Sequence, residues 1–282
     1  MLKKPGWLRA RHVHNPNLDM VETLLAQLNL NTVCKEANCP NLAACFSKKT
    51  ATFMILGTNC TRSCTFCNVQ HAEPQSLDPD EPERVAAAVL ALGLQYVVIT
   101  SVTRDDLPDG GAGHFASVIR AIKKTSPQTA VEALIPDFQG DLDALRLVTE
   151  AAPAVISHNM ETVAPLYPTV RPGADYQRSL SILQAIKAQN PNIHSKTGIM
   201  LGLGETKEQV YTLFDDLLAV DCEFLTIGQY LAPSKAHHPV RAYIPPEIFD
   251  EYGETARKKG FSFVASAPLV RSSYQAGEAL GL

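Results

Sequence analysis

The sequence predicts an α/β fold, a partial (β/α)6 TIM-type barrel, and two observations support this prediction. Short apolar runs alternate with longer helical stretches along the middle of the chain, an order that is typical of a parallel sheet. Polar motifs directly follow these apolar runs in the sequence. They would therefore lie at the carboxyl ends of the strands, which in a barrel surround a single opening. Six such units indicate a partial barrel rather than a full eight-stranded one. A doubly wound sheet is the alternative, because periodicity does not show whether a sheet closes.

The expected elements follow one another in a regular order. Strands are expected at residues 51–57, 94–100, 129–135, 154–158, 193–201 and 223–230. Helices are expected between them at residues 82–92, 113–124, 141–150, 176–188 and 207–219. Residues 1–50 and 232–282 flank this barrel of residues 51–231. We expect both flanking segments to cover the barrel opening as extensions of one compact domain.

The composition is that of a globular protein with one large core. The 282 residues are 45% hydrophobic and carry a formal net charge of -4. No apolar run reaches the roughly 18 residues of a membrane-spanning helix, and no secretory signal is recognised. Net acidity without a basic block argues against a nucleic-acid partner. Cysteines that are kept reduced indicate a cytoplasmic location.

Six of the seven cysteines form two triplets, and the second triplet has the spacing of an iron-sulfur site. Cys60, Cys64 and Cys67 read C-x3-C-x2-C, with Phe66 before the last cysteine. Full cysteine ligation of a 4Fe-4S cluster takes four thiolates, so three leave one iron open to a substrate. Cys64 and Cys67 alone would also suit a redox pair or half of a zinc site. A redox pair leaves Cys60 unexplained, however, and no second pair of ligands follows at zinc-site spacing.

The first triplet ends fifteen residues before the second begins. Cys34, Cys39 and Cys45 read C-x4-C-x5-C, a weaker pattern alone that gains weight from its partner triplet. A disulfide framework does not suit a long chain that concentrates its cysteines in one segment. The remaining cysteine, Cys222, opens the last strand-like run and is expected to be a small buried side chain.

Together with further motifs, the triplets resemble those of the lipoyl synthases in the radical S-adenosylmethionine superfamily. The resemblance covers nearly the whole chain. Its other motifs lie at residues 4–9, 32–41, 51–57, 100–107, 109–112, 135–138, 158–162 and 198–205, and at Arg271-Ser272-Ser273-Tyr274, called the serine motif below. Two positions depart from the family pattern: Ala267 stands where glycine is common, and Gln275 where histidine is. Neither change removes a ligand.

The resemblance implies the reaction and its cofactors. A 4Fe-4S cluster on the Cys60 triplet would bind S-adenosyl-L-methionine and cleave it, giving a radical that takes hydrogen from C6 and then C8 of an octanoyl chain. That chain is carried on a lysine, and a second, auxiliary 4Fe-4S cluster is consumed to supply two sulfur atoms. The chain would thus be a sulfurtransferase of lipoate biosynthesis.

The same resemblance implies two kinds of partner. One is an octanoylated lipoyl carrier, either the E2 subunit of a 2-oxoacid dehydrogenase or the glycine cleavage H protein. The other is a one-electron reductant such as ferredoxin or flavodoxin.

The resemblance also assigns the auxiliary ligands. Cys34, Cys39 and Cys45 would hold the auxiliary cluster, with Ser273 as its fourth ligand. A serine alkoxide matches iron less well than a thiolate does, so it can leave a cluster that is meant to be dismantled. Ser272 is expected to make hydrogen bonds within its own loop.

Six further residues are predicted to bind S-adenosylmethionine. The amino-acid part is assigned to Thr100, Ser101 and Arg104, and the ribose or carboxylate to Glu132, Asn159 and Arg171. The aspartates nearby, Asp105, Asp106 and Asp109, lie in a loop rich in proline and glycine, where carboxylates often cap turns. Residues 198–204 lack the lysine of a phosphate loop and are expected to approach the adenine.

Two other functions are less consistent with these residues. A different radical enzyme with an auxiliary cluster, such as a biotin-synthase-like sulfur inserter or a methylthiotransferase, is disfavoured by the Cys34 spacing together with the serine motif. A two-cluster electron carrier is disfavoured because each triplet lacks a fourth cysteine.

Overall fold

The computed structural model describes residues 3–8, 15–48 and 50–282, and its main element is a curved eight-stranded sheet. The strand order is β1-β2-β5-β6-β7-β8-β9-β10, and every neighbouring pair is parallel except β1 with β2. A small second sheet joins β3 (Asn59–Cys60) to β4 (Gln70–His71). The strands of the main sheet are β1 (Asn31–Thr32), β2 (Thr52–Ile55), β5 (Tyr96–Ser101), β6 (Ala130–Leu134), β7 (Val155–Ser157), β8 (His194–Leu201), β9 (Phe224–Gln229) and β10 (Phe263–Ser266).

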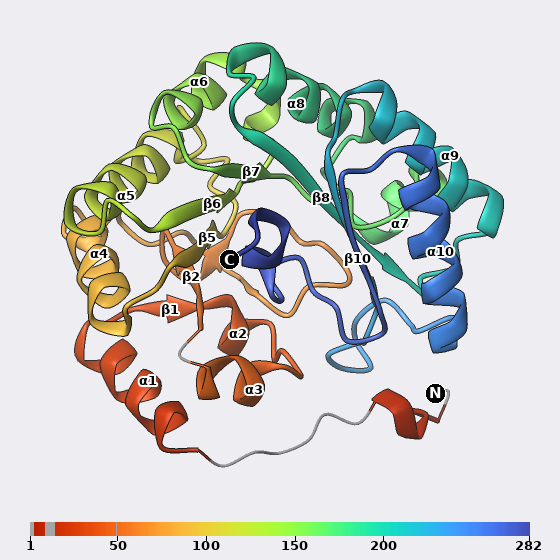
Figure 1. Cartoon of the computed structure of the whole chain (residues 1–282), viewed down its shortest axis with the longest axis horizontal. Helices are drawn as coiled ribbons and strands as arrows, with labels where there is room; N and C mark the ends of the chain where they lie inside the picture. Colours follow the sequence, from red (N-terminus) through yellow and green to blue (C-terminus); the bar gives the residue numbers. More distant parts are fainter. Residues whose placement is uncertain (1–2, 9–14, 49) are drawn as a thin grey trace.

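In the described parts of the chain the helices are α1 (Pro16–Gln27), α2 (Val33–Glu36), α3 (Leu42–Ser47), α4 (Glu81–Leu92), α5 (Ala112–Thr125), α6 (Leu142–Glu150), α7 (Tyr167–Val170), α8 (Tyr176–Gln189), α9 (Lys207–Ala219) and α10 (Pro246–Lys259). Helices α4, α5, α6, α8, α9 and α10 form a layer outside the arc of the sheet (Figure 1), and the other helices lie at its ends or near its mouth. Short 3-10 turns are η1 (Gly6–Leu8), η2 (Phe138–Gly140), η3 (Ala164–Leu166) and η4 (Ala276–Leu280). None of the helices described has both the length and the apolar composition needed to cross a membrane.

The predicted order of strands and helices is confirmed. The six expected strands correspond to β2 and to β5 through β9, and the five expected helices to α4, α5, α6, α8 and α9. Strands β1 and β10 are the two edges of the sheet, so the barrel is partial. Residues 232–282 were expected to be a covering extension, but they also contribute α10 and β10, which extends the sheet beside β9. The sequence pattern missed this unit because β10 is short and only half-buried, and α10 is rich in charged residues.

Side-chain caps fix where three outer helices begin. Asp141 accepts two main-chain N–H bonds at the start of α6, at 2.8 and 3.1 Å, and Asp175 accepts one at the start of α8, at 2.7 Å. Thr206 and Gln209 form a capping box at the start of α9. Each cap satisfies N–H groups that have no partner within the helix. The loops that lead from strand to helix around the barrel mouth therefore end at defined residues.

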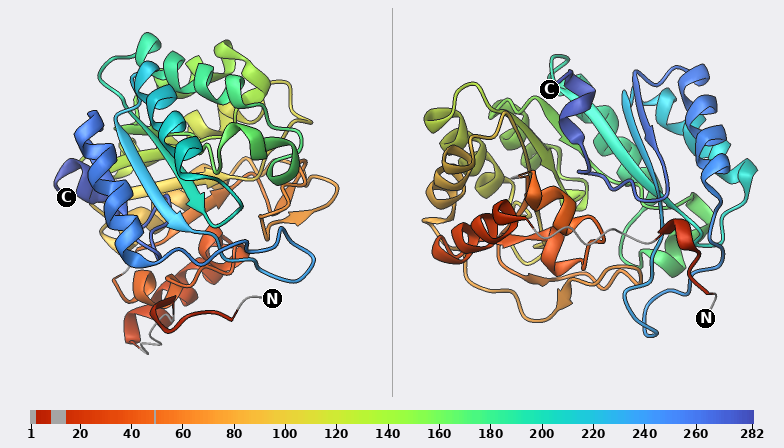
Figure 2. Two further views of the ribbon diagram at one scale, coloured as in Figure 1. Left: turned by 90° about the vertical axis from the view of Figure 1, so that its right-hand side faces the viewer. Right: turned by 60° about the horizontal axis from the view of Figure 1, so that its bottom comes forward.

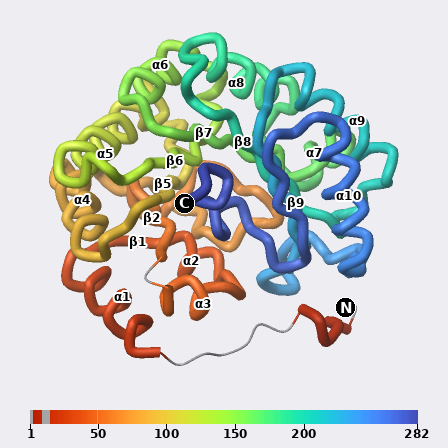
Figure 3. The backbone as a smooth tube through the Cα atoms, in the orientation of Figure 1, coloured from red at the N-terminus to blue at the C-terminus, as the bar shows by residue number. Residues whose placement is uncertain are grey.

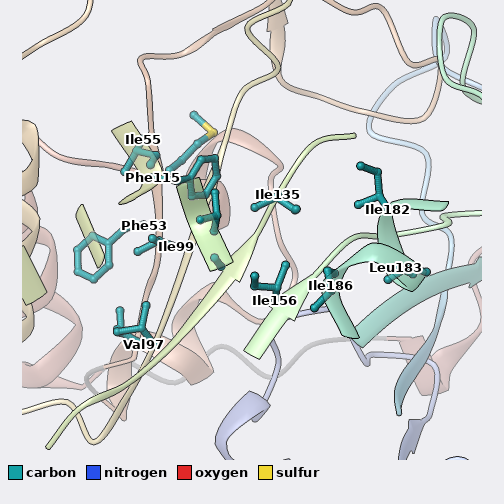
Figure 4. Close-up of a cluster of buried hydrophobic side chains, with 14 of the residues drawn as sticks. Phe53, Ile55, Val97, Ile99, Phe115, Ile135, Ile156, Ile182, Leu183 and Ile186 are labelled. Atoms are coloured by element: carbon teal, nitrogen blue, oxygen red, sulfur yellow. The ribbon is translucent and has the colours of Figure 1, made fainter. Parts of the chain in front are cut away.

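The hydrophobic core lies between the sheet and the outer helices. Figure 4 shows Phe53 of β2, Ile99 of β5 and Ile156 of β7 in this core, with Phe115 of α5 and Ile186 of α8. All five side chains are fully buried and belong to one cluster. Burying a side chain of this size contributes about 1.5–3 kcal/mol, so the cluster holds the helices firmly on the outer face of the sheet.

Both flanking segments come back to the inner side of the sheet. The chain after β10 runs inside the arc and ends in η4, where Gly277 packs against Tyr96 at the start of β5 (Figures 1 and 3). The N-terminal helix α2 packs against β1 and β2 (Figure 2). Residues from both segments thus border the same opening of the barrel.

A buried polar cluster lies one layer below this opening. Glu132 of β6 and Lys196 of β8 are 0% and 1% exposed, and the Lys196 Nζ lies 2.8 and 3.0 Å from the two Glu132 carboxylate oxygens. Tyr96 and Ser157 donate further hydrogen bonds to Glu132, at 2.6 and 2.8 Å. Side chains two positions apart on a strand share a face. Since Leu134 and Gly198 line the opening, Glu132 and Lys196 lie beneath its floor.

Lys196→Met is expected to destabilise the protein by about 3–5 kcal/mol, because it leaves the Glu132 carboxylate buried without a countercharge. Urea unfolding followed by circular dichroism measures the change. The exposed Lys258→Met is the control, and the double variant Lys196→Met with Glu132→Leu should recover much of the lost stability. Equal effects of Lys196→Met and Lys258→Met would contradict the prediction.

Candidate active site

A cavity of about 500 Å³ opens at the carboxyl ends of the strands, the position expected for an active site in this kind of barrel. Strands β5 to β9 contribute its floor through their last residues and the loops that follow. Cysteines of both triplets line it, as does the serine motif. The lining includes Cys34, Cys39, Cys60, Cys64, Cys67, Thr100, Ser101, Asn159, Glu161, Arg171, Arg271, Ser272 and Ser273.

The second triplet lies on the loop that follows β2. Cys60 is in β3, and its Sγ accepts main-chain N–H bonds from Arg62 at 3.5 Å and Thr103 at 3.3 Å. The main-chain N–H of Cys67 donates to the carbonyl of Cys64 at 3.2 Å, which closes the turn. Burial, reinforced by the neighbouring Cys64 and Cys60, raises the pKa of Cys67 to about 12. Bound iron would displace the thiol protons, because metals bind thiolates.

An arginine within this loop anchors it to the neighbouring strands. The Arg62 guanidinium lies 2.6 Å from Asp105 and 2.6 Å from Asp137, and Arg178 reaches Asp137 from α8 at 3.2 Å. Although burial opposes the shift, the hydrogen bonds and charge of Arg62 lower the pKa of Asp137 to about 2. Asp105 is therefore an ion-pair partner, whereas Asp109 caps its own turn as predicted, accepting N–H bonds at 2.9 and 2.8 Å.

The first triplet lies on two short helices beside β2 and on the turn between them. Cys34 lies in α2, Cys45 lies in α3, and the main-chain N–H of Cys39 donates to the Cys34 carbonyl at 3.0 Å. Burial, with a contribution from the nearby Cys34 and Cys39, raises the pKa of Cys45 to about 12. The three thiols are therefore close enough to affect one another's charge.

Ser273 reaches the first triplet through one intervening residue. The Thr52 hydroxyl donates to the Ser273 Oγ at 2.9 Å. Thr52 also lies beside the Cys34 thiol, where its main chain and hydroxyl oppose the rise in pKa that burial causes. The Ser273 hydroxyl and the Cys34 thiol are thus neighbours of the same side chain.

The rest of the serine motif faces the other two cysteines of this triplet. Arg271 is half-buried; burial lowers its pKa, and the nearby Cys39 and Glu161 oppose that shift. Burial, followed by the nearby Cys45, raises the pKa of Tyr274. Each cysteine of the first triplet therefore has a neighbour in or next to the serine motif.

The cysteine geometry does not match that of a single metal ion. Among the described residues, no three His, Cys, Asp or Glu side chains converge on one point in the way that a zinc ion requires. The thiolates of a cubane bind different irons, so they need not converge on one atom. Five of the six triplet cysteines line the cavity, and Cys45, which does not, lies near Cys34 and Cys39. This arrangement fits two such clusters.

Two buried donors in the cavity wall lack a protein partner. Within the described residues, neither the Ser101 Oγ nor the Arg171 Nε makes a hydrogen bond. Buried polar atoms are nearly always satisfied, so these two indicate the site of a polar ligand. The Nη1 of Arg171 is occupied, donating to the carbonyl of Asn159 at 2.8 Å. Thr100 lies beside them and donates to the Leu134 carbonyl at 3.1 Å. Four of the predicted ligand-binding residues, Thr100, Ser101, Asn159 and Arg171, thus line this cavity.

The structure does not bring the other two predicted residues, Arg104 and Glu132, to the cavity. The cavity wall in the described chain includes neither of them. Arg104 is 3% exposed, and its guanidinium donates hydrogen bonds to Asp106 at 2.8 Å and to the Leu56 carbonyl at 3.2 Å. Glu132 is paired with Lys196 beneath the floor. Both carry strong local partners, which prevents them from facing a ligand.

Two features of the site were missed from sequence. Glu161 lines the cavity with a left-handed backbone (φ 63°), accepts a hydrogen bond from the Asn159 Nδ2 at 3.0 Å, and has its pKa raised by burial. Its place in the motif at residues 158–162, after the fourth expected strand, was the available signal. Ser272 was expected to bond within its own loop, but its hydroxyl instead donates to the Asn159 Oδ1 at 2.7 Å. A contact between segments so far apart in the chain leaves no local pattern.

Comparisons with known proteins agree with this geometry. Residues 54–217 match the family model described as the Radical SAM superfamily. Proteins named lipoyl synthase from Alkaliphilus metalliredigens and Caldicellulosiruptor saccharolyticus are each 58% identical to the chain, over 99% and 98% of its length and 96% and 97% of theirs. Among solved structures, Streptococcus suis SuiB bound to its precursor peptide has a TM-score of 0.59 at 11% identity, covering 80% of this chain and 52% of SuiB. HydG, a maturase of the [FeFe]-hydrogenase, has a TM-score of 0.58 at 13% identity, covering 95% of this chain and 68% of HydG. The two structures share the fold.

Proposed function

The chain belongs to the lipoyl synthases of the radical SAM superfamily, and we propose that its two cysteine triplets and Ser273 hold the two 4Fe-4S clusters of that activity. Lipoyl synthase is a sulfurtransferase that inserts two sulfur atoms at C6 and C8 of an octanoyl chain on a carrier-protein lysine. The observation that carries the residue assignment is the meeting of both triplets and the serine motif at one cavity, with Thr52 joining Ser273 to Cys34.

Cys34, Cys39, Cys45 and Ser273 are assigned to the auxiliary cluster, and Cys60, Cys64 and Cys67 to the cluster that binds S-adenosylmethionine. When bound, the second of these supplies the electron that cleaves S-adenosylmethionine, and the auxiliary cluster supplies the sulfur. Loss of the Ser273 oxygen is easier than loss of a thiolate, because a hard alkoxide matches iron less well. That difference suits a cluster that is consumed.

The Ser101 hydroxyl and the Arg171 Nε have no hydrogen-bond partner among the described residues. This supports the proposal that they bind the amino-acid part of S-adenosylmethionine. The Arg171 charge, which acts on the nearby Cys64, suits the carboxylate of that ligand. Asn159 and Thr100 line the same cavity. These side chains would orient the ligand beside the open iron and exclude water from it.

Apolar side chains around the same cavity suit an octanoyl chain. They include Met54, Val102, Leu134, Ile199 and Met200. Unactivated C–H bonds offer no polar group for acid-base catalysis, so the protein's task is to hold the chain between the two triplets. The carrier would be an octanoylated lipoyl domain of a 2-oxoacid dehydrogenase E2 subunit or the glycine cleavage H protein. A cytoplasmic ferredoxin or flavodoxin would supply electrons.

The test is an anaerobic incubation of reconstituted protein with reductant, S-adenosylmethionine and an octanoyl-lysyl carrier peptide. Mass analysis should find the peptide carrying two sulfur atoms in place of two hydrogens, together with 5'-deoxyadenosine. Formation of 5'-deoxyadenosine without any sulfur in the peptide would contradict the proposal.

Ser273→Ala is expected to lower sulfur insertion by at least about tenfold and to lower auxiliary iron, because the fourth ligand is lost. Ser273→Cys should retain the iron but release it poorly, since a thiolate binds iron more tightly. Iron analysis and product mass measure the two effects.

The matched control is Ser272→Ala, which removes a hydroxyl from the adjacent residue and should leave the iron content unchanged. Loss of iron in Ser272→Ala but not in Ser273→Ala would reverse the ligand assignment. Full activity and full iron in Ser273→Ala would rule out a serine ligand in this chain.

A further inference from the structure

We propose that Ser272 and Asn159 form a hydrogen-bonded link that couples the position of the serine motif to the binding of S-adenosylmethionine. The inference rests on the proposed function and concerns how the two sides of that site affect each other. It makes Ser272 and Asn159 positioning residues, distinct from the cluster ligands.

Asn159 is the point where three segments meet. Its Oδ1 accepts from the Ser272 hydroxyl at 2.7 Å, and its Nδ2 donates to the Glu161 carboxylate at 3.0 Å. Its main-chain carbonyl accepts from the Arg171 Nη1 at 2.8 Å. One side of Asn159 therefore holds the serine motif, and the other side holds Arg171, a cavity-lining residue whose Nε has no hydrogen-bond partner among the described residues.

The surroundings leave little room for this link to rearrange. A Cβ at Gly198 of β8 would lie 2.9 Å from the Asn159 Oδ1, 3.3 Å from the Ser272 Oγ and 2.7 Å from the Thr226 Oγ1. The missing side chain at Gly198 thus provides the space in which the bond forms. Because the bond is short and enclosed, movement of Ser272 must break it or displace Asn159.

Ser272 is adjacent to Ser273 in the chain, so a change in the position of Ser273 at the auxiliary site affects the hydrogen bond between Ser272 and Asn159. While Ser273 occupies an auxiliary iron, Ser272 stays against Asn159. Departure of Ser273 from that iron would free the motif to move and would remove one of the supports of Asn159. Two molecules of S-adenosylmethionine are used per product, one before and one after the cluster is opened, so the second meets a site without this support. The coupling is reciprocal: S-adenosylmethionine that fixes Asn159 also favours the docked serine motif.

The test is equilibrium binding of S-adenosylmethionine to anaerobically reconstituted protein without reductant, so that no turnover occurs. Ser272→Ala should bind about 3- to 10-fold more weakly than the unaltered protein, the change expected for one lost hydrogen bond, at unchanged iron content. In an Asn159→Ala background, Ser272→Ala should have no further effect, as a double-mutant cycle requires of residues that act through each other.

Asn41→Ala is the matched control for general loosening of the C-terminal segment. The Asn41 Nδ2 donates to the Leu269 carbonyl at 2.7 Å, so it holds the same segment from the first-triplet side. Unchanged affinity in Asn41→Ala supports the link. The proposal would be overturned if Asn41→Ala weakened S-adenosylmethionine binding as much as Ser272→Ala does, or if Ser272→Ala left the affinity unchanged. It would also be overturned if Ser272→Ala still weakened binding in the Asn159→Ala background. Protein that carries both clusters yet binds no S-adenosylmethionine would instead overturn the proposed function.

Discussion

Replacing Cys60, Cys64 and Cys67 together with alanine is expected to abolish cleavage of S-adenosylmethionine and to halve the bound iron, from about eight to about four atoms per chain. These thiols lie on one loop, which Arg62 holds to Asp105 and Asp137, and the other triplet is assigned to the auxiliary cluster. Production of 5'-deoxyadenosine should fall below detection, more than about a thousandfold, because only a reduced cluster can supply the electron. Iron, acid-labile sulfide and 5'-deoxyadenosine are the measurements.

Cys222→Ala is the control for removing a thiol elsewhere. Cys222 is fully enclosed at the start of β9, with its Sγ close to the Phe224 carbonyl, and it should retain full iron and cleavage. A triple variant that still cleaves S-adenosylmethionine would refute the assignment of this cluster. So would unaltered protein that holds tightly bound zinc and no sulfide.

Replacing Cys34, Cys39 and Cys45 together is expected to remove sulfur insertion while cleavage of S-adenosylmethionine continues. The radical-generating triplet is on a different loop, whereas these cysteines lie on α2, on α3 and in the turn between them. The octanoyl peptide should emerge unmodified or unsaturated, because hydrogen is still abstracted but no sulfide is available. Product mass and 5'-deoxyadenosine, measured in the same reaction, separate the two activities. Sulfur insertion at the original rate would mean that the sulfur has another source.

The sequence predicted the parts of this protein that depend on local pattern. Repeated apolar runs and helical stretches predicted the main sheet, and cysteine spacing selected the ligands now assigned to each cluster. Strand β10 was missed because half-buried residues carry no strong apolar signal. Glu132 was misplaced because residues two apart on a strand share a face, and only the depth of the cavity floor separates Glu132 from Leu134.

Other features could not be predicted because they depend on partners distant in the chain. The Ser272 bond to Asn159 and the Arg62 pair with Asp137 join segments that only the folded sheet brings together. Arg104 was misassigned for the opposite reason, because its partner Asp106 is nearby and removes it from the cavity. The residue types of charged and polar side chains do not by themselves show which partner each side chain will bind.

The auxiliary site draws its ligands from both flanking segments, so its cluster would act as a clasp across the whole barrel. Joining Cys45 to Ser273 closes a loop of 228 residues (273 − 45), and long loops lose the most chain entropy when their ends are tied. Consuming the cluster opens that clasp. Spent enzyme is therefore expected to show faster hydrogen exchange in α2, α3 and residues 267–282 than enzyme that has not yet reacted, while β5 to β8 keep their protection. In this protein a catalytic cofactor would also serve as a tether, and each turnover would loosen the enzyme until the cluster is rebuilt.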